Sequence, residues 1–142
     1  MEIALCKAKC ASCGAEFSQP ELGDFAYGAF VFTGERGTVH AYFEVFEVPA
    51  PVWNFLEDVL PQPHSGELLQ GACAHFADPV TGQRLSNKFI CPKCQSSNLA
   101  YWGGERTGFA EVPEASFSQF MGLPKSERRR LALEFYRRFK AK

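Results

Sequence analysis

Cysteine is the residue type in this chain with the most evident chemistry, and four of the six cysteines form two C-x-x-C pairs. Cys10 and Cys13 stand in Cys-Ala-Ser-Cys-Gly, and Cys91 and Cys94 stand in Cys-Pro-Lys-Cys. The two thiolates of such a pair can bind one ion from a single turn, and two pairs complete the tetrahedral coordination of Zn²⁺. The spacing therefore predicts one Zn²⁺ bound by Cys10, Cys13, Cys91 and Cys94.

The predicted zinc is structural rather than catalytic. Four thiolates leave no coordination position for a water molecule or a substrate. In a reducing cytoplasm, paired C-x-x-C motifs favour metal binding over disulfides. A redox-active dithiol, another metal and no metal remain the alternatives.

Each cysteine pair lies between short candidate strands, and this arrangement resembles the zinc-ribbon group, in which two β-hairpin knuckles clamp one Zn²⁺. The resemblance covers residues 5–18 and 87–102. In this chain 77 residues separate Cys13 from Cys91, far more than a simple ribbon loop contains. The resemblance thus implies that residues 19–86 form an inserted lobe whose ends are joined by the ribbon. It implies little about function, because ribbons occur in nucleic-acid enzymes, chaperones and scaffolds.

The remaining cysteines and the histidines offer weaker candidates. Cys6 precedes the first pair by four residues and is an alternative ligand. Cys73 and His75 stand in Cys-Ala-His, and on a strand they would share a face as a nucleophile pair or second metal site. No third group is evident to orient such a base, so a buried thiol beside a surface histidine is the simpler interpretation. His40 and His64 are isolated.

Known catalytic motifs are otherwise absent from the sequence. There is no H-E-x-x-H, no G-x-S-x-G, no phosphate-binding G-x-x-x-x-G-K and no dinucleotide-binding fingerprint. We therefore expect a protein that is not an enzyme.

A β-hairpin and three helical segments must position these residues. With 142 residues, of which 46% are hydrophobic, the chain is expected to form one domain, residues 1–142. Aromatic and β-branched residues fill 25–33 and 38–48 on either side of a Gly-bounded turn, a pattern typical of a hairpin. Both faces of this hairpin are apolar, so it is either sandwiched in the fold or presents one face to a partner.

The helical segments differ in clarity. Pro51 begins a stripe of Val52, Phe55, Leu56 and Val59 at helical spacing. Residues 65–76 fit either a helix opened by Ser65 or a strand. Within the C-terminal helical segment, residues 113–142, the clearest amphipathic helix runs from 124 to 140, after a helical turn around 117–121. Short strands are expected at 3–9, 15–17, 88–90, 99–102 and 108–113, with a loop at 20–24. The predicted class is therefore α+β: zinc-ribbon knuckles, an inserted hairpin and helix lobe, and a C-terminal amphipathic helix.

Charge is distributed unevenly along the chain, although the net charge is -1. Residues 124–142 carry eight basic and two acidic side chains, a charge of +6, so residues 1–123 carry -7. Between Gly37 and Gln83 there is no Lys or Arg. An acidic body of this kind attracts basic partners through its long-range field, unless the tail simply neutralises an ordinary surface. The acidic side chains in this stretch are Glu44, Glu47, Glu57, Asp58, Glu67 and Asp78.

In outline, this profile is similar to the immunity proteins that bacteria keep against their own antibacterial toxins. Such proteins typically bind a toxin domain and block its active site, often through an acidic surface. The similarity implies a protein partner, with a basic toxin domain as the candidate. The expected binding surface contains Glu44, Glu47, Glu57 and Asp58, around the hairpin and the following helix.

A nucleic-acid-associated ribbon is the alternative, with the arginines of the C-terminal helix on phosphates. The body of the chain is acidic and both knuckles have few basic residues, so we rank this alternative below the protein-binding interpretation. No apolar run approaches the roughly 20 residues that span a bilayer, and the N-terminus lacks a signal-peptide pattern. A cytoplasmic location without membrane contact is therefore expected.

Overall fold

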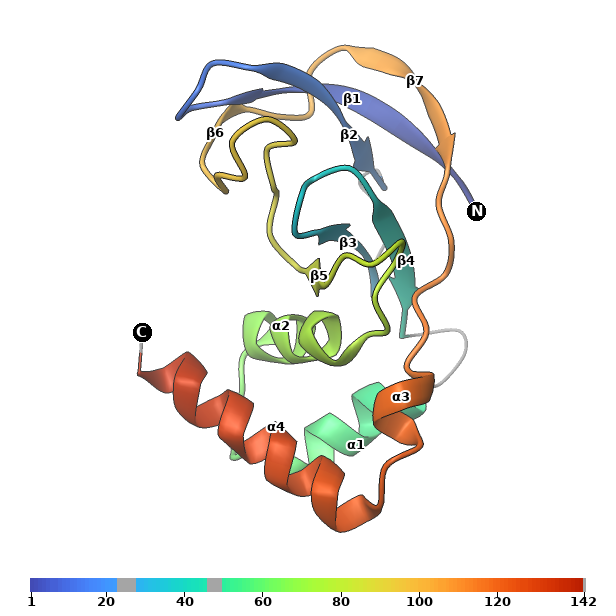
Figure 1. Cartoon of the computed structure of the whole chain (residues 1–142), viewed down its shortest axis with the longest axis vertical. Coiled ribbons are helices and arrows are strands. Elements are labelled where there is room, and N and C mark those ends of the chain that lie inside the picture. Colours follow the sequence, from blue (N-terminus) through green and yellow to red (C-terminus); the bar gives the residue numbers. More distant parts are fainter. Residues whose placement is uncertain (23–27, 46–49, 142) are drawn as a thin grey trace.

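The computed structural model describes residues 1–22, 28–45 and 50–141, which form two antiparallel sheets and four helices. In Figure 1 the first sheet lies at the top, the second sheet lies in the middle, and the helices lie below it. This mixed arrangement confirms the α+β class. The predicted hairpin therefore has one sheet on one side and helices on the other.

The first sheet is built around β1 (Glu2–Cys10), which leads into the first cysteine pair. One edge of β1 pairs with β2 (Glu16–Glu21), and the other pairs with β6 (Leu99–Tyr101) and β7 (Arg106–Glu111). Because β6 follows the second cysteine pair directly, its pairing with β1 brings the two pairs to one end of the sheet.

Two sequence predictions in this region are wrong. Pro20 and Glu21, expected in a loop at 20–24 and in the inserted lobe, belong to β2. The register explains why Pro20, which has no N–H group, is tolerated. The Cys10 N–H bonds to the Ala15 carbonyl, so alternate residue pairs along β1 and β2 are hydrogen-bonded. The Leu5–Pro20 pair is not one of these hydrogen-bonded pairs.

The expected strand at residues 88–90 is also absent. The strand lies earlier, at β5 (Leu85–Ser86), and the Ser86 hydroxyl accepts a hydrogen bond of 3.1 Å from the Lys88 N–H. Such a local side-chain bond turns the chain away from its neighbour. The second cysteine pair therefore sits on a turn, not on a β-hairpin, and its following strand pairs with β1 instead.

The second sheet contains the predicted hairpin. β3 (Ala29–Gly34) pairs with β4 (His40–Glu44) on one edge and, through Thr33 and Gly34, with β5 on the other. The turn between β3 and β4 is closed by a Gly37 N–H to Gly34 carbonyl bond of 2.8 Å. Parts of the predicted ranges, 25–27 and 46–48, lie outside the described residues.

Helices cover the lower face of the hairpin. α1 (Pro51–Val59) begins at Pro51 as predicted, and α2 (Gly66–Phe76) resolves the ambiguous segment as a helix. The Ser65 hydroxyl caps α2 by accepting a hydrogen bond of 3.1 Å from the Leu68 N–H. The short α3 (Ser118–Met121) and the long α4 (Lys125–Lys140) follow β7.

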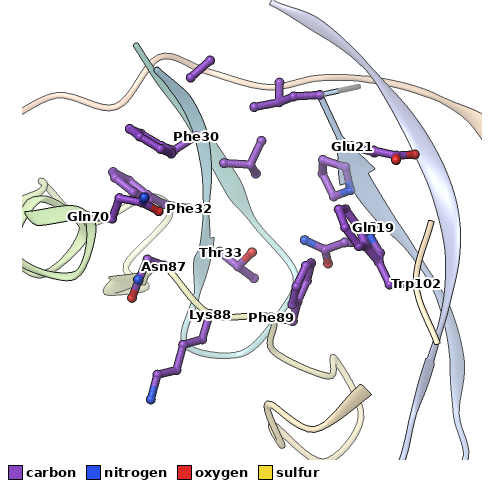
Figure 2. Close-up of a pocket in the computed structure, with 14 residues that line it drawn as sticks. Gln19, Glu21, Phe30, Phe32, Thr33, Gln70, Asn87, Lys88, Phe89 and Trp102 are labelled. Carbon is purple, nitrogen blue, oxygen red and sulfur yellow. The ribbon is translucent and has the colours of Figure 1, made fainter. Parts of the chain in front are cut away.

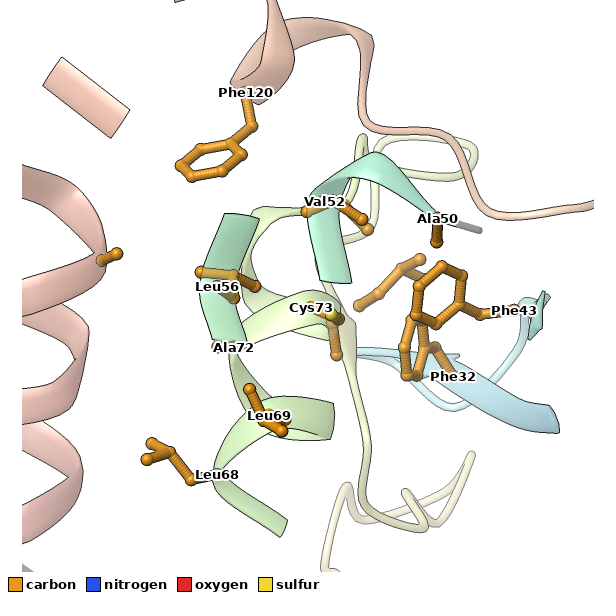
Figure 3. Close-up of a cluster of buried hydrophobic side chains, with 14 of the residues drawn as sticks. Phe32, Phe43, Ala50, Val52, Leu56, Leu68, Leu69, Ala72, Cys73 and Phe120 are labelled. Atoms are coloured by element: carbon orange, nitrogen blue, oxygen red, sulfur yellow. The ribbon is translucent and has the colours of Figure 1, made fainter. Parts of the chain in front are cut away.

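The main core lies between this sheet and the helices. Phe32 is fully buried and its ring packs 5.6 Å from that of Phe43. Figure 3 shows these two rings facing α1 and α2, which carry Leu56 and Cys73. The predicted apolar stripe of α4 closes the outer side of the core, where Phe135 packs 6.0 Å from Phe76. The apolar stripes predicted for the segment that begins at Pro51 and for the C-terminal helix thus both contribute to this core.

Candidate metal centre

The two cysteine pairs adopt the same backbone turn. The Gly14 N–H donates to the Cys10 carbonyl at 3.0 Å, and the Gln95 N–H donates to the Cys91 carbonyl at 2.8 Å. Gly14 and Gln95 both have a left-handed backbone, with φ of 76° and 61°. Glycine adopts this conformation freely, whereas for Gln95 it costs conformational energy. Such an outlier, found next to cysteine ligands, is typical of a functional site.

Two further contacts join the turns to each other. The Ala11 N–H donates to the Asn98 carbonyl at 2.9 Å, and the hydroxyls of Ser12 and Ser96 are 2.8 Å apart. The residues between the cysteines of the first pair are therefore fixed directly to the segment that follows the second pair. This contact holds two turns that are distant in sequence in one orientation.

The four thiols converge at the point where the turns meet. The sulfur atoms of Cys10, Cys13, Cys91 and Cys94 all lie within 4.8 Å of one another, and the Cys10–Cys94 and Cys13–Cys91 separations are 3.6 Å. A tetrahedral ion with Zn–S bonds of about 2.3 Å requires sulfur atoms about 3.8 Å apart. The distances are far longer than a disulfide bond. The cluster is consistent with a zinc-binding site, as predicted.

The thiols also have the electrostatics of a cation site. A hydrogen bond from the backbone of Cys13 lowers the pKa of Cys10 to about 6, so its thiolate forms near neutral pH. For Cys94, a backbone hydrogen bond from Ser96 lowers the pKa, but desolvation and the neighbouring thiols outweigh it and raise the pKa to about 12. Crowded thiolates repel each other, and a divalent cation removes that repulsion. The donor set therefore fits Zn²⁺.

The cluster is buried on one side and open on the other. Cys10 and Cys91, the first cysteine of each pair, are 1% and 0% exposed, whereas Cys13 and Cys94 are exposed. All four ligands come from the protein, so coordination of Zn²⁺ would be complete without water. The chemistry available to such a site is structural.

The other candidate cysteines are not ligands of this cluster. Cys6 is buried, and its thiol donates to a Glu21 carboxylate oxygen at 2.6 Å. This hydrogen bond raises the pKa of Cys6. Cys73 is fully buried on α2, and desolvation raises its pKa to about 12. Both thiols are held in their unreactive protonated form.

Within the described residues, no histidine belongs to the metal-binding cluster. On a helix Cys73 and His75 point in different directions, so they do not form the shared-face pair that a strand would give. His75 lies against the rings of Phe76 and Phe135, at 4.9 and 5.1 Å. Desolvation lowers the pKa of His40 to about 4. His64 lies within hydrogen-bonding distance of the Glu57 carbonyl, at 3.3 Å.

Gly37 connects the metal centre to the second sheet. The sequence alone did not predict this contact. Gly37 has a φ of 76°, and a Cβ atom there would lie 2.5 Å from the Ile90 carbonyl oxygen and 2.9 Å from the Pro92 nitrogen. The hairpin turn therefore packs backbone to backbone on the segment that begins the second cysteine turn. A glycine bounding a turn signals its left-handed conformation, but nothing local indicates the close approach.

We expect Gly37→Ala to destabilise the protein by more than its backbone conformation alone explains. Gly82 is the matched control: its φ is 75°, but no heavy atom would lie within 4 Å of a Cβ there. Gly82→Ala should cost about 1 kcal/mol from the left-handed conformation, and Gly37→Ala at least about 2 kcal/mol more. Urea denaturation of both variants measures the difference, and equal losses would show that the contact can relax freely.

The acidic side chains of the predicted partner surface come from two elements. Glu44 ends β4, where it accepts a hydrogen bond of 2.8 Å from the Tyr42 hydroxyl. Glu57 and Asp58 lie near the end of α1, with Asp58 exposed. Glu47 lies outside the described residues. The structure thus leaves this surface as a prediction.

Asp78, another acid of the segment without basic residues, has an internal role. Its carboxylate accepts hydrogen bonds from the Ser116 hydroxyl at 2.7 Å and from the backbone N–H groups of Ser118 and Gln119. Desolvation raises the pKa of Asp78, but these three donors outweigh it and lower the pKa. Asp78 therefore fixes the start of α3 rather than adding to a binding surface.

Several arginines of α4 are engaged within the chain. Arg130 pairs with Glu127 and Glu134, and Arg138 pairs with Glu134 at 2.6 Å. The guanidinium of Arg128 lies 4.8 Å from the centre of the Phe55 ring. These contacts reduce the positive field that α4 offers to a phosphate backbone.

Comparisons of this chain with protein-family models, with curated proteins and with solved structures gave no match. Among the described residues, no helix is both long and apolar enough to cross a membrane.

Proposed function

We propose that this protein is a cytoplasmic, non-catalytic zinc protein that binds a protein partner, and that it acts as an immunity-type inhibitor of a bacterial toxin. One observation carries the first part. Four convergent thiols, all from the protein, would complete the coordination of Zn²⁺ and leave no position for a substrate. A zinc ion bound in this way supports a scaffold, and in this proposal the scaffold acts by binding a partner.

In this proposal the metal acts as a ribbon-like clasp. The first cysteine pair lies at the end of β1 and the second precedes β6. After β2, which returns to the first sheet, the chain between the pairs contains β3, β4, α1, α2 and β5. One ion would join the two ends of this inserted lobe. The entropic cost of bringing the two ends of a segment together rises with its length. A clasp that joins the ends of a long segment is therefore the most stabilising. The lobe, held in this way, presents the acidic surface.

Charge supports a basic partner over nucleic acid. The -7 charge of residues 1–123 repels phosphates, and two arginines of α4, Arg130 and Arg138, are already paired with glutamates of the same helix. An acidic surface that blocks a basic toxin domain fits this distribution. A toxin that acts on nucleic acid has such a basic active-site cleft, which gives the inhibitor a surface to match.

The test begins with affinity purification of the tagged, zinc-loaded chain from its native cell. The proposal expects a toxin domain as the co-purifying protein, with its activity lost at one equivalent of inhibitor. Recovery of polymerase or ribosomal components instead, with no inhibition of a toxin, would overturn it. A gel-shift assay at low salt with generic DNA and RNA tests the alternative directly.

We expect reversal of Glu44, Glu47, Glu57 and Asp58 to Lys to weaken the complex with that partner at least about tenfold, mostly through slower association. A control variant with Glu2, Glu35, Glu105 and Glu111 changed to Lys has the same net charge, and these side chains are exposed elsewhere. Surface plasmon resonance at two salt concentrations compares the two variants. Equal affinities of the two variants would show that the proposed surface does not bind the partner.

A further inference from the structure

A groove of about 420 Å³ lies between the two sheets, beside β3. Its walls come from β2, β3, the segment after β5 and the residue that follows β6. Five consecutive β3 residues, 29–33, line it. Consecutive residues of a strand point alternately to opposite faces, so a run of five identifies the edge of β3, rather than a face, as the wall.

The register of the hairpin shows which backbone groups reach this edge. The Gly34 N–H bonds to Val39 and the Val45 N–H bonds to Gly28, so the even-numbered residues of β3 bond to β4. The backbone groups of Ala29 and Val31 therefore point away from β4. β5 pairs with Thr33 and Gly34 and then turns away. Within the described residues, no hydrogen-bond partner is found for the outward groups of Ala29 and Val31.

The neighbouring edges of the molecule are protected, in contrast to this one. The outer edge of β4 is covered, since the Tyr42 N–H bonds to Pro113 and the Tyr42 carbonyl accepts from Ala115. On β2, Pro20 occupies a position whose backbone points outward, which removes a donor from that edge. Among the described residues, the outward donors and acceptors of Ala29 and Val31 thus remain without a hydrogen-bond partner in the groove.

Side chains around the groove add specificity. Figure 2 shows Phe89 and Trp102 on one side of β3, and their rings are 4.9 Å apart. Trp102 is 43% exposed, a large apolar surface beside a strand edge. Lys88 is an exposed residue of the lining, and no ion pair of Lys88 is found among the described residues, whereas the acidic Glu21 of the lining accepts a hydrogen bond from Cys6. The Lys88 ammonium group favours an acidic group on whatever binds.

We propose that this groove binds an extended segment of a partner protein, which adds to β3 as a strand. The segment would pair with Ala29 and Val31, place an apolar side chain on Phe89 and Trp102, and direct an acidic group toward Lys88. Main-chain hydrogen bonds would supply affinity, and alternate side chains would supply specificity. The inference does not depend on the partner being a toxin, and it concerns a surface separate from the acidic residues above.

The test uses a phage-displayed library of random heptapeptides on the full-length, zinc-loaded chain. Selected peptides should share an aromatic or aliphatic residue and an acidic residue. The best binder is then synthesised with one backbone amide N-methylated at a time. Strand addition predicts losses of about tenfold or more at every second amide and little change between them, because alternate amides face β3.

Variants and hydrogen exchange locate the site. Trp102→Ala should weaken binding about tenfold, Tyr101→Ala should not, and Lys88→Glu should abolish the preference for an acidic residue. Binding should slow amide exchange at Ala29 and Val31 in the unaltered protein. Any of three results would overturn the proposal: no binder, losses without the two-residue period, or a Val31 amide already protected in the free chain. Protection that grows with protein concentration would instead assign the edge to a second copy.

Discussion

Removal of zinc will unfold this protein. We expect the chain to contain one Zn²⁺, and a chelator or the Cys10→Ser, Cys91→Ser double variant to abolish its cooperative thermal transition. Structural zinc contributes on the order of 10 kcal/mol of apparent binding energy, which becomes folding energy where the unfolded chain has no site. A domain of this size is stable by about 5–15 kcal/mol in total. Loss of the ion therefore removes most or all of the stability.

The positions of the cysteine ligands explain why loss of the ion should disorder both sheets. Cys10 ends the central strand of the first sheet, and Cys91 begins the turn on which the hairpin residue Gly37 packs. Without the ion, the four sulfur atoms within 4.8 Å of one another have no cation to hold them together at the junction of both sheets. Both sheets should lose order together, visible as loss of near-ultraviolet circular dichroism.

Cys6→Ser is the control for this experiment. Cys6 lies on the same strand but bonds to Glu21 and not to the cluster. Elemental analysis should find one zinc per chain in this variant and less than one in the double variant. A metal-free protein that melts at the temperature of the original would contradict the proposed role of the cluster.

The metal centre was predictable because its signal is local. Two C-x-x-C pairs define the donor set, and Gly14 marks the left-handed residue of the first turn. The second turn uses Gln95 for the same conformation, and a glutamine carries no such signal. The second turn is held instead by hydrogen bonds that the chain makes only after folding, such as the one between Ser12 and Ser96.

The body of the fold was predictable where local patterns are strong. The hairpin follows from aromatic and β-branched runs around a Gly-bounded turn, the first helix from a proline and an apolar stripe at helical spacing, and the C-terminal helix from an i, i+4 stripe. Pro20 within β2 and the absence of a strand after Ser86 did not follow, because register and a side-chain hydrogen bond decided them. Pairing between distant strands is a tertiary property, so the order β2-β1-β6 was not readable from sequence.

Replacement of Phe32 by Ala should have the second largest effect, a loss of about 3–5 kcal/mol in the free energy of unfolding. Phe32 is 0% exposed and packs between Phe43 and the helices, so truncation leaves a cavity that the surrounding elements cannot fill. Phe109, 59% exposed on β7, is the matched control, and its replacement by Ala should change stability by less than about 1 kcal/mol. Equal losses would place the stabilising core elsewhere.

The same variant tests whether the chain unfolds as one unit. Phe32 lies far from the thiols in sequence, but its hairpin ends in the turn that packs on residues 90–92. Loss of core packing should therefore release zinc in the same transition that unfolds the helices, followed with a zinc-sensitive dye and far-ultraviolet circular dichroism. Two separate transitions, with zinc retained after the helices have melted, would show that the first sheet and its metal centre are stable without the helical body.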